Sequence, residues 1–477
     1  MIYKTVVKKI KLMDTKKQHS HHQKHLLRKE LHHGEKVALN IAKHKLNRKR
    51  FNRFLRVLGP GLITGAADDD PSGIATYSQT GAGFGFSLLW VFPVMYPLLL
   101  AVQESCSRIG AITGKGLAAV IKENYSKKLL YMSVGLVVIA NTINIGADLG
   151  AMVAAMRLLV PIPFGVLAVA FAVLVVLLEV FVDYKSYAKI LKWLAIVLFA
   201  YPITAFLVGQ PWLSILKTTF IPHISLNFTT IYILVGIIGT TISPYLFFWD
   251  TSEVAENEIV THRATESGNT APKVTKHFLH GIRVDNFVGM TLTIVTAWFI
   301  VVTCASVLFK SGVTQINTAA DAAQALQPLV QNFPHAGLIA KLLFSVGIIG
   351  IGLLSVPVLA GSSSYAICEA AGWKQGLHRK YKRAKAFYGV IGGATLVGLL
   401  INFIGVDPIK ALIFTAVFNG IAAIPLLFML AKVGNNKNIM GEFKNGKLSN
   451  TLVRLSFLIM LSAVLVLFYA MLSGKSA

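Results

Sequence analysis

Charged residues are scarce in this chain. Only 14% of the 477 residues are charged, whereas 54% are hydrophobic and the mean hydropathy is +0.62. So little polar surface excludes a soluble globular protein. Cysteine is also rare: Cys106, Cys304 and Cys368 stand singly, without a CxxC pair, which predicts packed thiols rather than a cysteine metal site. P-loop, HExxH and GxSxG elements are missing as well, which argues against a membrane enzyme.

The sequence contains many long apolar stretches. Stretches of about 20 residues, enough to cross about 30 Å of hydrocarbon, recur along the whole sequence. We therefore expect an all-α polytopic membrane protein with about 11 transmembrane helices. The expected spans lie near residues 55–80, 86–109, 130–156, 163–182, 188–208, 230–256, 283–309, 337–371, 386–405, 408–431 and 452–473.

The formal net charge of +25 is unevenly placed. Lys and Arg gather in the first 50 residues and in alternate connections between the spans, which is the positive-inside pattern rather than a nucleic-acid surface. The pattern predicts a multi-pass protein of the cell (plasma) membrane with a cytoplasmic N-terminus and an extracellular C-terminus. No nucleic-acid partner is expected. The first 50 residues contain no apolar h-region, so no cleavable signal peptide is expected either.

Residues 1–53 form a basic, His-rich cytoplasmic tail. Its composition predicts a disordered segment that lies on anionic lipid headgroups of the bilayer. Neutral imidazoles also bind transition metals, so metal sensing or delivery is an alternative role. The histidines at issue include His19, His21, His22, His25, His32 and His33.

Three carboxylates interrupt the first apolar span. Asp68, Asp69 and Asp70 precede Pro71 and Gly73 inside a stretch that is otherwise apolar enough to cross a bilayer. Charge at membrane depth is costly unless it lines a cavity or meets a counter-ion, and proline with glycine breaks a helix. The segment therefore predicts an ion site on an interrupted helix.

A second interruption occurs in the sixth span. Thr240 and Ser243 precede Pro244 in the middle of an apolar run. Breaks at corresponding positions of two halves are typical of inverted-repeat transporters, whose site lies near the bilayer midplane. We expect a transporter core at 54–432, with repeat one at 54–208 and repeat two at 230–432. A cytoplasmic loop and the eleventh helix would then occupy 433–477.

At these two breaks the chain resembles the Nramp family of divalent-metal transporters, which have a LeuT-type fold of two inverted five-helix repeats plus extra helices. The resemblance implies that Asp70 is the metal-binding aspartate. Gly73 falls on a ligand asparagine, Ser243 falls on a ligand methionine, and Thr240 falls on a small residue whose carbonyl faces the metal. Backbone freed near Ser72 would complete the shell.

Other positions depart from the family pattern. Tyr245 replaces a histidine associated with proton transfer, and Ala151 stands where a glutamate is expected, although Asp148 is kept. Asp68, Asp69, Asp148 and Tyr245 are expected to line the vestibule or support the site. Replacing a soft thioether with Ser243 leaves hard oxygen donors, which suit Mg²⁺ better than transition metals. The chain is therefore most similar to the Nramp-related magnesium transporter branch.

The leading hypothesis is import of divalent cations, Mg²⁺ and/or Mn²⁺, by alternating access. The missing relay residues predict uniport without proton coupling, and no cofactor is expected beyond the transported cation. Three alternatives remain open: a proton-coupled symporter for Mn²⁺ or Fe²⁺, an amino-acid or solute symporter on the same fold, and a membrane metal sensor. The acidic triplet argues against a substrate that carries its own carboxylate.

Polar residues outside the breaks receive ordinary explanations. Glu104, Glu179, Asp285 and Glu369 lie at or near span ends, where pairing with Lys or Arg is expected. Pro357 predicts a further helix break in a segment of small residues that packs against its neighbours. Residues 319–326 predict a lid helix between spans seven and eight.

Overall fold

The structure is a computed structural model that describes residues 65, 68–182, 196–222, 227–260 and 274–473. This part of the chain is helical throughout and contains no strand. The expected tail at 1–53 lies outside it. The helices are α4 Pro71–Phe84, α5 Val91–Thr113, α6 Leu117–Asn124, α7 Lys127–Met156, α8 Phe164–Phe181, α10 Ala200–Leu207, α11 Trp212–Phe220, α12 Phe228–Thr241, α13 Pro244–Val260, α14 Lys276–Val307, α15 Ala319–Gln324, α16 Ala336–Ala371, α17 Lys385–Ile401, α18 Pro408–Asn435, α19 Lys437–Met440 and α20 Lys447–Leu472.

Seven spans in the described residues are long and apolar enough to cross a membrane. They are α7, α8, α14, α16, α18, α20 and the pair α12 and α13, which together form Phe228–Ile259. An eighth candidate joins Val197–Leu207 to α11 through a bend of 118°. The spans expected at 86–109 and 386–405 correspond to α5 and to the shorter α17. The span expected at 55–80 lies partly outside the described residues, and α4 corresponds to its second part. The polytopic all-α class is confirmed.

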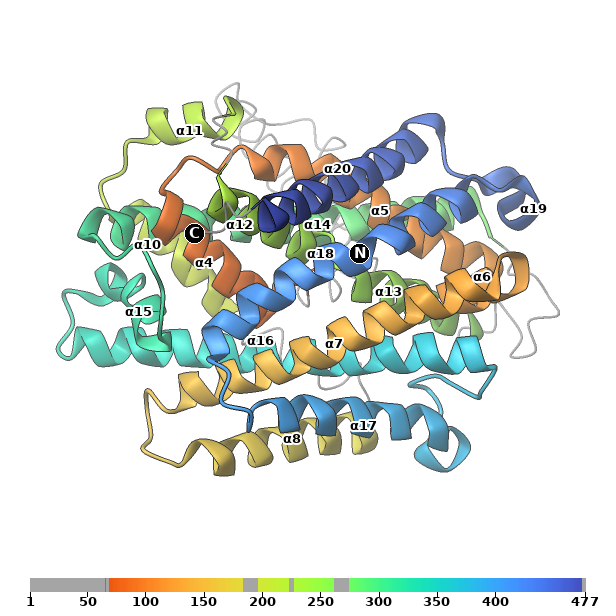
Figure 1. The fold of residues 1–477 in the computed structure, drawn as a ribbon, viewed down its shortest axis with the longest axis horizontal. Helices are drawn as coiled ribbons and strands as arrows, with labels where there is room; N and C mark the ends of the chain where they lie inside the picture. Colours follow the sequence, from red (N-terminus) through yellow and green to blue (C-terminus); the bar gives the residue numbers. More distant parts are fainter. Residues whose placement is uncertain (1–64, 66–67, 183–195, 223–226, 261–273, 474–477) are drawn as a thin grey trace, which may run out of the picture. The chain divides into compact units, whose positions relative to one another are not determined.

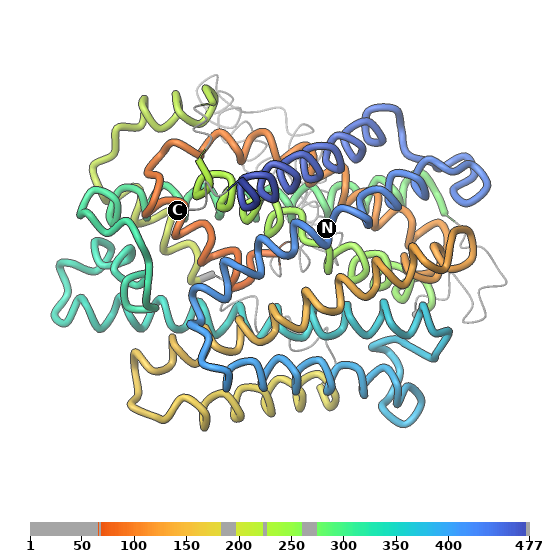
Figure 2. The backbone as a smooth tube through the Cα atoms, in the orientation of Figure 1, coloured from red at the N-terminus to blue at the C-terminus, as the bar shows by residue number. Residues whose placement is uncertain are grey.

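The helices form two packed groups. In one group α4, α5, α12, α13 and α14 contact one another, and in the other α7 and α16 pack together with α8 and α17 beside them. Figure 1 shows α7 and α16 side by side, with α8 and α17 running along them, and Figure 2 traces the same paths. Helix α18 contacts α7, α12 and α20, which connects the two groups.

Close helix approaches depend on glycine. A Cβ on Gly239 of α12 would lie 2.2 Å from the backbone oxygen of Ala416 in α18. Only a residue without a side chain allows the two backbones to come so near, and such contacts replace the hydrophobic drive that is missing inside lipid. The same helix surfaces therefore bring the second break close to its neighbours.

Helix α16 corrects one prediction. It runs without interruption through Pro357 for 36 residues, so the break predicted there is wrong. Membrane helices tolerate an internal proline where neighbouring helices satisfy the freed backbone groups, and α16 packs along α7. The expected packed interface of small residues is present, because Ser363 accepts a hydrogen bond from Asn141 Nδ2 (3.0 Å) and Ser364 Oγ donates to Phe387 O (2.6 Å).

Smaller expectations from the sequence are confirmed. The helix predicted at 319–326 is present as α15, Ala319–Gln324, which begins with a capping box between Thr318 and Asp321. Its role as a lid stays a prediction. All three cysteines are buried and free. The structure thus agrees with packed thiols that take no part in disulfides.

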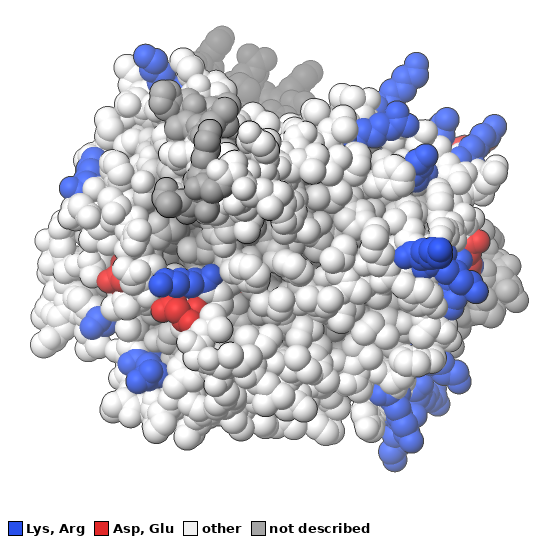
Figure 3. All heavy atoms as spheres, in the orientation of Figure 1, with Lys and Arg blue, Asp and Glu red and all other residues white. Residues whose placement is uncertain are grey.

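Charged side chains avoid the middle of the molecular surface. Figure 3 shows the middle of this face almost free of charge, with Lys and Arg gathered most densely toward the end where α6 and α19 lie. An uncharged middle between charged ends is the surface that a bilayer requires.

Candidate cation-binding site

The first break lies at the start of α4. Asp70 is the N-cap of this helix, and Pro71 takes the first helical position, where a missing N–H costs nothing. Asp70 Oδ1 accepts hydrogen bonds from Gly73 N (2.7 Å) and from Ser72 Oγ (2.7 Å). The sequence Asp-Pro-Ser-Gly therefore both ends the preceding segment and fixes the carboxylate at the helix N-terminus.

The second break separates α12 from α13. Helix α12 ends at Thr241 and α13 begins at Pro244, so Ile242 and Ser243 lie outside both helices. Ser243 Oγ donates to the carbonyl oxygen of Thr240 (2.6 Å). That carbonyl is the group that the resemblance points at the metal, and in this structure the Ser243 hydroxyl satisfies it.

The two breaks face each other. A Cβ on Gly73 would lie 3.1 Å from Thr240 Oγ1 and 3.5 Å from Asp70 Oδ1. One turn further along α4, Tyr77 OH and Thr241 Oγ1 are 3.1 Å apart. The structure therefore brings together the residues that the sequence places at separate interruptions, and Gly73 keeps open the space between Asp70 and Thr240.

Helix α7 contributes a residue that the sequence analysis missed. Asn144 Nδ2 donates to Asp70 Oδ2 (2.8 Å). Its neighbours on the same helix face bond elsewhere: Asn141 contacts α16, and Asp148 Oδ2 accepts from Ser355 Oγ of α16 (3.0 Å). The available signal was the spacing of 141, 144 and 148, which places three polar side chains on one face of an apolar helix.

The remaining predicted residues surround this centre. Ser72 donates to Asp70, while its carbonyl accepts from Thr76 Oγ1 (2.7 Å). Tyr245 is fully buried at the start of α13, and its carbonyl accepts from Ser362 Oγ of α16 (2.6 Å). Both residues therefore hold backbone groups of the half-helices in place.

The site is closed to water and rich in oxygen. The exposed fractions of Asp68, Asp69 and Asp70 are 0%, 4% and 1%, and Asp148 is fully buried. Several buried oxygens have no hydrogen-bond partner within the described part of the chain, namely both carboxylate oxygens of Asp68 and the atoms Asp69 Oδ1, Asp148 Oδ1, Thr240 Oγ1 and Asn144 Oδ1. Such a donor set is hard, and it matches the oxygen ligands that Mg²⁺ and Mn²⁺ take.

Carboxylates alone do not complete a metal shell here. Among the described residues, no group of three or more His, Cys, Asp and Glu is placed to hold a metal ion. A cation beside Asp70 would therefore use hydroxyl, amide or backbone oxygens, or keep part of its own water shell. Partial hydration is the usual state of Mg²⁺ in proteins.

A small apolar cavity adjoins the first break. It measures about 20 Å³ and extends from Pro71 to Ala319 and Ala322 of α15. A volume of this size admits about one water molecule. Helix α15 thus lines this cavity, and it lies at the end of the molecule opposite α6 (Figure 1).

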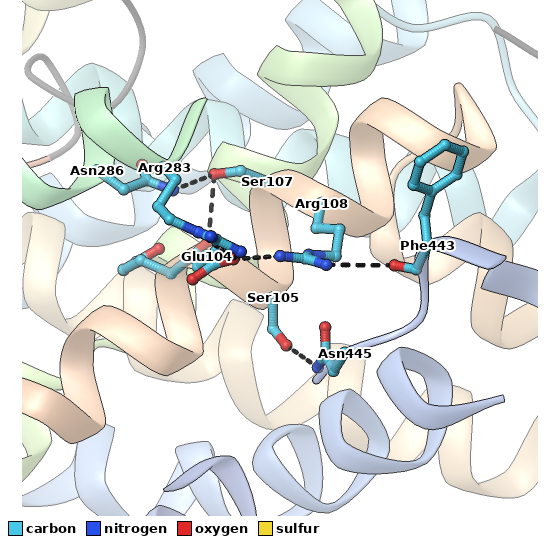
Figure 4. A network of polar contacts seen from close by, with 9 residues as sticks. Glu104, Ser105, Ser107, Arg108, Arg283, Asn286, Phe443 and Asn445 are labelled. Atoms are coloured by element: carbon cyan, nitrogen blue, oxygen red, sulfur yellow. Dashed lines mark hydrogen bonds and ion pairs between the residues drawn. The ribbon is translucent and has the colours of Figure 1, made fainter. Parts of the chain in front are cut away.

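A polar network joins helices at the α6 end (Figure 4). Glu104 of α5 accepts from Arg283 Nε of α14 (3.0 Å) and from Arg108 one turn along α5, so its expected pairing with Arg is confirmed. Arg108 in turn donates to Phe443 O (3.4 Å), and Asn445 donates to Ser105. The network connects α5 to α14 and to the connection before α20.

The other acidic residues have different surroundings. Glu369 accepts from Ser252 Oγ of α13 (2.7 Å) and from Ala119 N of α6 (3.2 Å), so its environment is not the expected pairing with Lys or Arg. Asp250 accepts from Ser107, which also accepts from Asn286 Nδ2 (2.8 Å). Glu179 is buried, and neither of its oxygens has a hydrogen-bond partner among the residues described.

The fold has close relatives among solved structures. A manganese transporter from Eremococcus coleocola superposes with a TM-score of 0.67 at 19% identity, covering 88% of this chain and 87% of that one. Mhp1, a nucleobase-cation-symport-1 family transporter, superposes with a TM-score of 0.53 at 12% identity. At these identities the likeness shows the fold alone, and it confirms the LeuT-type architecture expected from the sequence.

Sequence comparison gives the same family. The divalent metal cation transporter MntH of Clostridium acetobutylicum is 27% identical over 454 residues, which is 91% of this chain and 97% of that protein. The MntH of Caldanaerobacter subterraneus is 27% identical over 440 residues, or 89% and 95% of the two chains. The family described as natural resistance-associated macrophage protein-like (Nramp) matches residues 61–470. Because this match extends over both breaks and nearly all of the helices, the chain belongs to the Nramp family.

Proposed function

We propose that this protein imports divalent metal cations, Mg²⁺ and/or Mn²⁺, by alternating access, as a uniporter without proton coupling. The observation that carries the proposal is the carboxylate of Asp70, held at a helix break directly opposite a second break. Relatives named divalent metal cation transporters and a structural neighbour named a manganese transporter support the substrate class.

The residues at the two breaks share the binding of the cation. Asp70 is the main ligand, either direct or through water, and Thr240 and Ser243 add oxygens from the opposite half-helix. Backbone near Ser72 and Gly73 completes the shell. Asp68 and Asp69 raise the negative potential that attracts the cation, and Asp148 and Tyr245 line the vestibule.

The hydrogen-bond partners around the carboxylates favour uniport. Asp70 bonds to a hydroxyl, a backbone N–H and an amide, and Asp148 bonds to the hydroxyl of Ser355. None of these partners takes up or releases a proton at physiological pH. The resemblance expects a histidine associated with proton transfer where this chain has Tyr245, and a glutamate where it has Ala151.

The direction of transport and the topology belong to the same proposal. The dense Lys and Arg at the α6 end correspond to the connections assigned to the cytoplasm. The N-terminus would therefore be cytoplasmic and the C-terminus extracellular. The His-rich tail at 1–53 would rest on anionic lipid headgroups at this same membrane surface.

A vesicle flux assay tests the function. Proteoliposomes that contain the full chain and an internal pH dye are offered Mg²⁺, Mn²⁺, Ca²⁺ or Zn²⁺. We expect Mg²⁺ and Mn²⁺ uptake without matching acidification, and we expect Asp70→Asn to lower the uptake at least about a hundredfold because it removes the anionic ligand. Undiminished uptake by Asp70→Asn would refute the site. Acidification in proportion to the metal taken up would refute uniport and establish the symporter.

A further inference from the structure

Two asparagines of α7 provide a natural comparison. Asn141 and Asn144 are both fully buried and lie one helical turn apart. Asn141 Nδ2 donates to Leu359 O (3.1 Å) and Ser363 Oγ (3.0 Å), both in α16. Asn144 Nδ2 instead donates to Asp70 Oδ2 (2.8 Å). Of these two asparagines, Asn141 therefore bonds to the neighbouring helix α16, and Asn144 bonds to the carboxylate at the first break.

The contact with Asp70 fixes which way the Asn144 amide faces. A carboxylate only accepts hydrogen bonds, so the amide nitrogen must be the atom directed at Asp70. The amide oxygen, Asn144 Oδ1, is buried and has no hydrogen-bond donor among the residues that the structure describes. Buried carbonyl oxygens nearly always have a partner, so this oxygen is available to one from outside the chain. Asn141 Oδ1 is also buried without a partner in that part of the chain, and Asn144 differs from it by its contact with the Asp70 carboxylate.

Simple geometry places that oxygen within reach of the same cation as Asp70. The nitrogen and oxygen of one amide are about 2.3 Å apart. Because Nδ2 lies 2.8 Å from Asp70 Oδ2, Asn144 Oδ1 lies within about 5 Å of it. Two oxygens bound to one Mg²⁺ are at most about 4.2 Å apart, and two oxygens that share it through a bound water are farther apart. Both arrangements fit this span.

The surrounding oxygens make the same place suitable for a hard cation. Thr240 Oγ1 is buried without a partner next to Gly73, and Asp68 has two unpartnered carboxylate oxygens. These atoms come from both breaks, whereas Asn144 comes from the opposite helix group through α7. Helix α7 thus adds an oxygen beside Asp70 that comes from neither break.

We propose that Asn144 is a cation-binding residue of this transporter, in which Nδ2–H orients Asp70 and Oδ1 coordinates the substrate cation directly or through a bound water. The inference rests on the proposed function and names a ligand that neither of the two breaks supplies. The amide oxygen that binds the cation comes from α7. Movement of α4 against α7 would then pull Asp70 and Asn144 apart and release the cation.

Mn²⁺ and Mg²⁺ uptake by proteoliposomes tests this assignment, with Asn141→Leu as the matched control for Asn144→Leu. Both substitutions replace a buried asparagine of α7 with an apolar side chain of similar size. We expect Asn144→Leu to raise KM for both ions at least about tenfold, and Asn141→Leu to leave it within about twofold. Asn144→Asp keeps an oxygen at this position, so it should bring KM back toward the wild-type value. Asn144→Ala gives the same readout if Asn144→Leu does not fold.

Three results would overturn the inference. The first is a KM for Asn144→Leu within about twofold of wild type, and the second is an equal rise in Asn141→Leu, which would indicate helix packing alone. The third is an Asn144→Asp variant as impaired as Asn144→Leu, because then an oxygen at this position does not help to bind the cation. A wild-type chain that carries neither ion would instead refute the proposed function, and with it this role of Asn144.

Discussion

At the scale of single residues, Gly73 determines the space between the two breaks. A methyl group there would lie 3.1 Å from Thr240 Oγ1 and 3.4 Å from the Tyr77 ring. These contacts ask the neighbours to move by only a few tenths of an ångström, and alanine gains about 1 kcal/mol of helix propensity over glycine. We expect Gly73→Ala to keep its thermal stability in detergent while metal uptake falls about threefold to tenfold, because the methyl group fills volume beside Asp70. Unchanged uptake kinetics would show that this volume is not used.

A second glycine of α4 provides the contrast. A Cβ on Gly81 would lie 2.5 Å from the backbone oxygen of Val301 and 2.9 Å from Ala305 N in α14. Backbone cannot yield as a side chain does, so Gly81→Ala should cost about 1–3 kcal/mol of stability and lower the melting temperature. Equal melting temperatures for the Gly73 and Gly81 variants would contradict this difference.

Sequence reasoning reached some of these residues and missed others for a physical reason. Asp70, Gly73, Thr240 and Ser243 could be singled out because proline and glycine mark a helix break locally. Asn144 could not, because its importance depends on how α7 packs against α4, and a buried asparagine in a membrane helix equally suits a packing hydrogen bond such as that of Asn141.

At the scale of helices, α13 is tied to α16 by one carboxylate. Glu256 Oε2 accepts from Tyr365 OH (2.5 Å) and Leu377 N (3.0 Å), and its Oε1 accepts from His378 N (2.6 Å). The His378 ring adds a contact of 3.1 Å from Nδ1. One carboxylate thereby fastens the half-helix after the second break to the other helix group.

Removal of this carboxylate should be costly. We expect Glu256→Ala to lower the free energy of unfolding by about 2–3 kcal/mol, since it leaves several donors without an acceptor. The control is Glu123→Ala, which breaks the more exposed pair of Lys115 and Glu123 (2.7 Å) and should cost less than about 0.5 kcal/mol. Thermal melting in detergent compares them. A smaller loss for Glu256 than for Glu123 would refute the tie.

Proline predicts the helix breaks correctly at two positions and wrongly at a third. Pro71 and Pro244 begin new helices, as expected, because each follows residues with polar groups that end the preceding turn. Pro357 looked similar but lies within the continuous α16. The difference is tertiary, because a proline interrupts a helix only if neighbouring helices do not compensate for the lost hydrogen bond.

At the scale of the whole molecule, the three cysteines permit a clean test of topology. All are buried, so they should not react with a membrane-impermeant maleimide in the intact protein. We expect Ser473→Cys to be labelled on intact cells, whereas Asn438→Cys is labelled only after permeabilisation. These outcomes follow from an extracellular C-terminus and a cytoplasmic connection before α20. The reverse pattern would invert the proposed orientation.

The length of α16 also matters at this scale. Thirty-six residues span about 54 Å, well beyond the hydrocarbon thickness of about 30 Å. The helix must therefore tilt or extend past the membrane at its ends. Its last turn carries Glu369, which accepts hydrogen bonds from α6 and α13 and so holds this end of the long helix against both of them.

The burial of the aspartates has a kinetic consequence. An open pore passes ions as fast as they arrive, but here Asp70 has an exposed fraction of 1%, and no ion reaches it while the helices keep their positions. Every turnover waits for a movement that takes microseconds to milliseconds. The rate must therefore saturate at high ion concentration, and it stays below about a million ions per second however steep the gradient is.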